Sequence, residues 1–247
     1  GDKMRNAMII AKRELVGYYT SPVAYVFLVI FLVLTGFFTF MMGNFFARND
    51  ASLLSFFVWH PWLYMLLVPA VGMRLWAEEH RMGTLELLFT MPIAPAQAIW
   101  GKFIAGWIFL GVALLLTLPM VFTVYYLGEP DGGPILTGYL GSFLMAGCYL
   151  SLSGMTSAMT RNQVISFITS VVICLLLVLA GYPPVTNILL KWGAPNALVE
   201  FAAGLSVVFH FESMQRGVLD IRDLIYFLSV IAFAIFTTGV VLKSKRS

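Results

Sequence analysis

Uncharged stretches long enough to cross a bilayer recur along this chain of 247 residues. A transmembrane helix needs about 20 apolar residues to cross roughly 30 Å of hydrocarbon. We expect six spans, at about residues 23–42, 54–73, 100–127, 135–158, 163–182 and 223–242. Their apolar residues are continuous rather than alternating, which favours helices over a β-barrel. The sequence therefore predicts an all-α membrane protein with six transmembrane helices, the third of them kinked at Pro119.

The composition supports a membrane protein and disfavours metal or redox chemistry. Only 11% of the residues are charged, against about 25% in a soluble domain. Cys148 and Cys174 both fall inside predicted spans, where we expect small buried hydrophobic side chains rather than a disulfide or metal ligands. The histidines His60, His80 and His210 fall in different compartments, and none has a cysteine or second histidine at ligand spacing. We therefore expect no metal site.

Nucleotide hydrolysis and ion coupling are also disfavoured. No Gly-rich phosphate-binding loop of the Walker type occurs, so we expect the chain not to be an enzyme and to bind no ATP or other cofactor. The middle of every predicted span lacks a charged residue. Ion-coupled carriers retain such costly charges as relays, which argues against a proton- or sodium-driven carrier.

The distribution of Lys and Arg predicts the orientation of the chain. With a cytoplasmic N-terminus, eleven of the 15 Lys and Arg residues lie inside the cell. The four that lie outside are Arg48, Lys191, Arg216 and Arg222. We therefore place both termini in the cytoplasm; the family resemblance described below implies the cytoplasmic (inner) membrane of a bacterium.

Two further segments are expected to be helical. Residues 4–20 predict an amphipathic helix lying in the membrane interface, with Arg5, Lys12 and Arg13 on another side from its apolar residues. Those apolar residues are Met4, Met8, Ala11, Leu15 and Tyr19. A solvated basic segment with incidental apolar residues is the alternative. Residues 183–222 predict two or three short helices, one capped by Asn196, folded back on or into the outer leaflet.

The charged segment EEHRMGTLELLFTMPI, residues 78–93, lies within the predicted cytoplasmic region 74–99. Gly83 permits a turn, Thr84 is a candidate N-cap, and Glu86 would stand in the first turn of the helix that follows. Pro92 disfavours helix from residue 91 onward. A helix of six or seven residues, about 10 Å long, remains, and so short a helix needs a partner to be stable.

The same segment carries an apolar ridge. Met82, Leu85 and Leu88 or Phe89 repeat at helical spacing, and charged residues stand beside them. Such a ridge suits docking into a groove on another protein. A cytoplasmic hairpin that packs on its own helix ends is the alternative.

Two motifs resemble one protein family. EEHRMGTLELLFTMPI is similar to the stretch "E-E-(basic)-x-G-T-(aliphatic)-E-L-L-(x)-T-x-P-(aliphatic)" of ABC-2 type transporter permeases, the membrane subunits of type-2 ABC exporters. HFESMQRGVLDIRDLIYF, residues 210–227, resembles the run before the last span in the gliding-motility (Gld) branch of that family. The motifs stand in the right order and compartments, so the resemblance extends over the whole chain, residues 1–247, as one transmembrane domain.

The resemblance implies a permease dimer, either a homodimer or a closely related heterodimer, that binds two separate ABC ATPase subunits. Those subunits would hold the ATP and Mg. Residues after the second span would form the coupling helix, which rests in a groove on the ATPase. The matching positions are Glu78, Glu79, Arg81, Gly83, Thr84, Glu86, Leu87, Leu88 and Pro92, and Leu85 joins the predicted contact as a residue of the apolar ridge. Met82 and Phe89 are added by helix geometry alone, and Lys12, Arg13 and Glu14 would form a second ATPase contact.

An extracytoplasmic gate at the dimer centre is also implied. Its residues would be His210, Phe211, Arg216, Gly217, Asp220, Arg222 and Asp223. A charge cluster that holds the outer segment on the last span is the alternative to direct substrate contact. The first, second and fifth spans would line the path between protomers, with small residues such as Gly36 and Gly72, which suits a lipophilic or amphiphilic substrate.

Two functions remain open from the sequence. The first is the permease subunit of an ATP-driven exporter. The second is a mechanical transmitter that passes ATPase motion to an extracytoplasmic accessory protein without moving a solute. The outer segment could provide the docking surface that a transmitter needs, and no nucleic-acid partner is expected.

Overall fold

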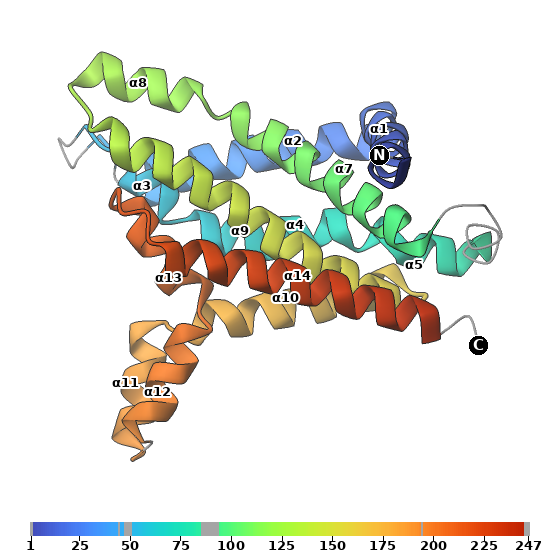
Figure 1. Ribbon diagram of the computed structural model, residues 1–247. Helices are drawn as coiled ribbons and strands as arrows, with labels where there is room; N and C mark the ends of the chain where they lie inside the picture. Colours follow the sequence, from blue (N-terminus) through green and yellow to red (C-terminus); the bar gives the residue numbers. More distant parts are fainter. Residues whose placement is uncertain (1, 44, 47–50, 85–93, 194, 245–247) are drawn as a thin grey trace.

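The computed structural model describes residues 2–43, 45–46, 51–84, 94–193 and 195–244, and within these ranges every regular element is a helix (Figure 1). The elements are α1 (Asp2–Thr20), α2 (Pro22–Phe37), the π-helix η1 (Phe38–Met42), α3 (Leu54–Phe57), α4 (His60–Gly72), α5 (Arg74–Met82), α7 (Pro95–Leu115), α8 (Pro119–Leu127), α9 (Gly132–Met159), α10 (Gln163–Leu179), α11 (Pro183–Lys191), α12 (Asn196–Gly204), α13 (Val207–Gln215) and α14 (Ile221–Ser244). The predicted all-α membrane fold is confirmed.

Four helical stretches of the described chain are long and apolar enough to cross a membrane alone. They are Pro22–Met42, Pro95–Leu127, Gly132–Met159 and Ile221–Ser244. Each coincides with a predicted span. The fifth predicted span corresponds to α10, which bends by 71° into α11, and α12 and α13 form a second bent pair with an angle of 66°.

The second predicted span, 54–73, is not one helix. It is divided among the single turn α3 and the 13-residue helix α4, with α5 following directly. At 1.5 Å per residue α4 is about 20 Å long, shorter than a full crossing. It nevertheless runs through the bundle, because it packs against α9, α10, α2 and α7.

The third predicted span is interrupted where proline predicts it. The regular helix stops at Leu115, and Pro119 begins α8 as its first residue. Proline has no N–H to bond the preceding turn, so it favours the start of a helix over its interior. Thr117, between the two helices, donates its hydroxyl hydrogen to the carbonyl of Leu114 at 2.6 Å.

Helix α9 is the centre of the bundle. It packs against α14, α4, α10, α13, α7 and α5, and most of its length is buried. It approaches α4 closely at Gly72, where a Cβ atom would stand 2.2 Å from Cβ of Ser153. Small residues allow helix backbones to approach in this way, which is how membrane helices gain packing contacts.

The two ends of the bundle differ. One end, called the α1 end here, carries α1, α5 and the C-terminal end of α14, and the opposite end carries α3, α8 and α13 (Figure 1). Helix α1 is seen nearly end-on in that view, so it crosses the spans rather than continuing them. An interfacial helix is expected to have this orientation.

The buried face of α1 agrees with the predicted one in part, because Ala11 is buried and Leu15 and Tyr19 pack against the core. Ile10 and Ala11 are buried against α7, whereas Met8, predicted to lie on the apolar face, is 61% exposed. Ile10 fits against Gly101 of α7, where a Cβ atom would stand 2.8 Å from its Cγ2. The shape of α7 therefore decides which side of α1 is buried.

The predicted outer segment contains three short helices, as its Pro and Gly residues suggest. Only α13 packs into the bundle, against α9 and α10. Helices α11 and α12 project away from it as an arm (Figure 1), in which α11 buries no residue and α12 buries only Val199. Asn196 begins α12, but Pro195 holds the cap position and no side chain caps the helix.

Candidate functional site

Helix α5 connects the bundle to the predicted coupling segment. It ends at Gly83, whose φ of 70° is the left-handed conformation that glycine adopts without steric cost. The turn predicted at Gly83 is therefore present. The predicted contact residues Leu85, Glu86, Leu88 and Phe89, with Leu87 and Pro92, lie outside the described residues.

The other predicted ATPase contacts lie at the α1 end. Exposed among them are Lys12, Arg13, Arg81, Met82, Gly83 and Thr84, and Glu78 is partly buried. Glu79 is also partly buried and belongs to α5 rather than to a loop. The charged residues 78–81 are thus the last turns of a helix that begins at Arg74, directly after α4.

A serine of α9 fixes the start of α5. The Ser157 hydroxyl accepts hydrogen bonds from the backbone N–H groups of Trp76 at 3.0 Å and Ala77 at 2.9 Å. It donates to the carbonyl of Met73 at 2.8 Å. The hydroxyl therefore replaces a helical hydrogen bond between Ala77 and Met73, and such insertion is a known cause of helix breaks. The break between α4 and α5 is consequently held from a different span.

A buried lysine ties α5 to two more helices. Lys102 of α7 is 7% exposed at its side chain and lies 2.8 Å from Oε1 of Glu79 and 3.5 Å from Oε2 of Glu14. Its ammonium group also stands 5.4 Å from the ring centre of Trp76. We call Lys102, Glu79 and Glu14 the lysine cluster. A buried charge is tolerated only when paired, and here two carboxylates supply the pairing.

The lysine cluster attaches α1 to the helix bundle. Of the three predicted ATPase contacts on α1, Lys12 and Arg13 are exposed, whereas Glu14 is partly buried and pairs with Lys102 of α7. Arg13 pairs with Glu14 at 2.9 Å from the exposed side. Next to it, Tyr18 stacks on Phe109 with ring centres 5.1 Å apart, and burial raises the pKa of the Tyr18 hydroxyl, with Glu14 adding to the shift. Helix α1 is therefore fixed to α7 by both charge and packing.

Sequence reasoning missed Lys102 and Ser157. Lys102 was counted only as an inside charge, although it stands within the third predicted span and needs a partner there. Ser157 belongs to a group of hydroxyl side chains near the end of α9. That group comprises Ser151, Ser153, Thr156 and Ser157. Hydroxyl residues in a membrane helix indicate contacts with neighbouring helices, and this signal could have identified the serine.

The opposite end of the bundle brings several predicted gate residues together. Asp223, buried at the start of α14, lies 2.7 Å from Nδ1 of His210 and accepts a hydrogen bond from Ser213. Nε2 of His210 lies 3.0 Å from the carbonyl of Gly204. Tyr226 stacks on His210 at 4.0 Å and donates to the carbonyl of Leu205 at 2.6 Å. We call His210, Ser213, Asp223 and Tyr226 the outer cluster.

The remaining predicted gate residues do not join the outer cluster. Arg216 pairs with Glu212 on the exposed side of α13. Asp220 accepts a hydrogen bond from the backbone of Arg222 at 2.9 Å, and both side chains are exposed. Phe211 is fully buried against α9, and Gly217 has a φ of 88° next to Pro134. Of the four Asp and Arg residues in the predicted gate, Asp223 is the one that anchors the segment.

Replacing Asp223 by asparagine is expected to loosen α12 and α13 from α14. Two polar partners, His210 and Ser213, would lose a buried carboxylate, at a cost of about 1–3 kcal/mol in local stability. Hydrogen exchange of residues 196–216 measures the effect, and we expect exchange to accelerate about tenfold or more. Asp220→Asn, a change at an exposed carboxylate, is the matched control. Equal exchange in both variants would contradict the anchoring role.

The described residues contain no group of three or more His, Cys, Asp or Glu side chains that could hold a metal ion. The two ends of the bundle instead carry structural clusters. At the α1 end, three helices converge on α5 directly before the predicted coupling segment. At the opposite end, the outer cluster holds the base of the arm.

A comparison with protein families gives one match. The family model described as "ABC-2 family transporter protein" matches residues 62–246, about three quarters of the chain. The matched range begins within α4 and includes both clusters except Glu14. No curated protein matches the chain.

Proposed function

This chain belongs to the ABC-2 family of transporter proteins, and from that premise we propose that it couples ATP hydrolysis by a separate ATPase subunit to translocation across the membrane. The chain is a multi-pass membrane protein of the permease type. In the proposal, two ATPase subunits bind a permease dimer at the α1 end, which the distribution of Lys and Arg predicts to be cytoplasmic.

One observation carries the proposal. Helix α5 is bonded to α9 through Ser157 and to α7 and α1 through the lysine cluster, immediately before the segment that resembles a coupling helix. A force applied to residues 84–93 would therefore be transmitted to three membrane helices. A free cytoplasmic hairpin would not need such anchoring.

The proposed roles follow from position. The exposed residues Arg81, Met82 and Thr84 would contact the ATPase with the segment 85–93. Glu79 would transmit the motion inward, because its carboxylate is engaged with Lys102. Lys12 and Arg13, exposed on α1, would form a second contact with the same subunit.

Replacing Leu85 by aspartate is expected to prevent assembly with the ATPase. A charge placed on the apolar ridge would have to be desolvated at the interface, which costs several kcal/mol when no partner is present. We would copurify the chain with its candidate ATPase and expect loss of at least about 90% of the bound subunit. The matched control is Leu85→Met, which keeps the apolar character and volume. Full assembly and ATP-dependent function in the aspartate variant would contradict the coupling assignment.

A second candidate function is favoured by the arm. Trp192 is 82% exposed and Phe201 is 69% exposed, on helices that leave the bundle at the end opposite α1. Such a surface suits an extracytoplasmic partner to which motion is passed without solute transport. ATP-dependent movement of a defined solute into vesicles by the reconstituted complex would contradict this transmitter function.

A further inference from the structure

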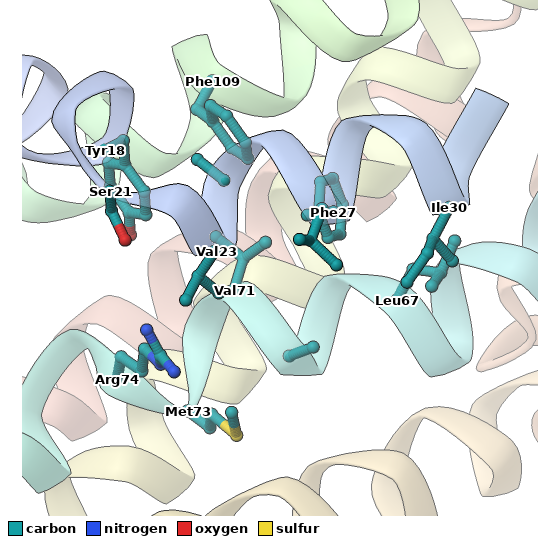
Figure 2. A pocket seen from close by; sticks show the side chains of 13 residues that line it. Tyr18, Ser21, Val23, Phe27, Ile30, Leu67, Val71, Met73, Arg74 and Phe109 are labelled. Carbon is teal, nitrogen blue, oxygen red and sulfur yellow. The ribbon is translucent and has the colours of Figure 1, made fainter.

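A groove lies between α2 and α4, and Figure 2 shows the side chains that line it. Its cavity volume is about 210 Å³. The walls are apolar, with Val23, Phe27 and Ile30 from α2 facing Leu67, Ala70 and Val71 from α4. Ligand sites are typically concave and mostly apolar, with few polar groups that fix orientation.

The groove is polar at one end only. Figure 2 shows Arg74, Ser21 and Tyr18 at this end, and Ile30 and Leu67 at the other. The Arg74 guanidinium is directed toward the space between α2 and α4, and its buried Nε has no hydrogen-bond partner. In the part of the chain that the structure describes, Arg74 has no ion pair closer than 4.0 Å. An unpaired buried donor indicates a missing acceptor.

The polar end continues into a second cavity of about 280 Å³. Tyr18, Ser21 and Arg74 line both cavities, and the second is also lined by Glu14, Glu78, Glu79 and Lys102. Glu14 and Glu79 are engaged by Lys102. Glu78 has no ion pair within the described residues, although it follows Arg74 by four positions on the same face of α5. One cation and one carboxylate therefore face the cavities without a partner.

The depth of the groove matches a membrane lipid. Its polar end lies where α1 meets α2 and where α4 meets α5, at the predicted boundaries of the first two spans. Its apolar end lies within those spans. A lipid headgroup at Arg74 would stand at the membrane surface, and its acyl chain would lie in the hydrocarbon layer.

We propose that this groove binds one phospholipid whose headgroup carries a phosphate and a primary ammonium group, as phosphatidylethanolamine does. Arg74 binds the phosphate, since guanidinium matches phosphate oxygens with charge-assisted hydrogen bonds. Glu78 accepts hydrogen bonds from the ammonium group. The acyl chain lies between α2 and α4.

The charges of the site favour this headgroup over two others. Three carboxylates and two cations line the second cavity, so a headgroup with net negative charge, such as phosphatidylglycerol, is repelled. Phosphatidylcholine carries the same charges, but its quaternary nitrogen has no N–H to donate to Glu78. Glu78 therefore distinguishes ethanolamine from choline.

Binding is tested on the purified full-length chain without an ATPase, so the result does not depend on the proposed exporter function. The protein in mixed micelles is offered phosphatidylethanolamine, phosphatidylcholine or phosphatidylglycerol with identical acyl chains, and native mass spectrometry counts the lipid retained. We expect one molecule of phosphatidylethanolamine, held about tenfold more tightly than the other two. Equal retention of all three lipids would overturn the headgroup assignment.

Substitutions of Arg74 and Glu78 test the roles proposed for these two charged side chains in binding the headgroup. Arg74→Gln should weaken binding of phosphatidylethanolamine about tenfold, and Glu78→Gln should remove the preference over phosphatidylcholine. Arg161→Gln, which changes an exposed arginine at the start of α10, is the matched control. Retention of the preference in Glu78→Gln would show that Glu78 does not read the ammonium group.

Filling the groove tests the acyl-chain site. Ala70→Phe adds a ring from a partly exposed wall position, and Val26→Phe does so from the facing helix. Either substitution should remove the retained lipid, and the second remains informative if the first does not fold. Ile168→Phe, at an exposed position on α10, is the control. Undiminished lipid in a folded Ala70→Phe or Val26→Phe protein would place the lipid elsewhere.

Discussion

The Lys102→Met variant is expected to lose ATP-driven function and about 2–4 kcal/mol of stability. Removing the ammonium group leaves the partly buried carboxylate of Glu79 without a cation and leaves Glu14 with only the exposed Arg13 as a partner. Breaking a buried ion pair by removing one partner costs about 3–5 kcal/mol, and the partial exposure of both glutamates reduces that figure. Function is lost because α5 would no longer be held to α7 and α1.

Two comparisons isolate the effect of the lysine cluster. Lys243→Met removes an exposed lysine from the last turn of α14 and should leave both melting temperature and activity near those of the parent. Adding Glu79→Gln to Lys102→Met removes one of the stranded charges and should restore part of the stability, which defines a double-mutant cycle. Thermal unfolding in detergent and ATP-dependent function of the reconstituted complex are measured for each. An undiminished melting temperature in Lys102→Met would refute the role of the cluster.

The second large effect is expected from Gly72→Ala. The added Cβ atom would stand 2.2 Å from Cβ of Ser153, which is fixed by the α9 backbone, so the two helices would have to separate. Overpacking of this kind costs about 1–3 kcal/mol or more. Separation would also withdraw the Ser157 hydroxyl from the break between α4 and α5, because Ser157 lies one turn beyond Ser153 on α9. Both stability and coupling should therefore fall.

Gly36→Ala is the matched control for Gly72→Ala. No atom lies within 4 Å of the Cβ position at Gly36, and alanine favours the helix by up to about 1 kcal/mol. This variant should be unchanged or slightly more stable in thermal unfolding. Equal melting temperatures for the two variants would be inconsistent with close packing of α4 on α9. From the sequence, both glycines were expected to line the translocation path, and only their surroundings distinguish them.

The positions of the membrane spans were predictable from the sequence where a single property, such as uncharged length, determines them. The spans of α2, α9 and α14 follow from uncharged length alone, and Pro119 marks the break between α7 and α8. The family was predictable as well, because the motif at residues 78–93 is long and specific, and the family match confirms it. The Gld branch, the ATPase contact and the gate remain predictions.

The details that the sequence did not predict are decided by contacts between distant residues. Hydropathy gave one span for residues 54–73, which the structure divides between α3 and α4. The break that follows α4 is held by Ser157, eighty positions from Ala77. The spacing of apolar residues in α1 predicted an apolar face that includes Met8. In the structure Met8 is exposed, and Ile10 packs against Gly101 of α7. Neither partner can be found from local pattern, because each lies on another helix.

The central position of α9 has a consequence for biogenesis. It is rich in glycine and serine, is the least apolar of the four long spans, and is shielded by its neighbours along most of its length. A segment of this kind partitions from the translocon into lipid less readily than α2 or α14 would. We expect α9 to integrate stably only with the helices that enclose it, so that its insertion depends on α4 and α7, which precede it, and is completed when α10 and α14 follow.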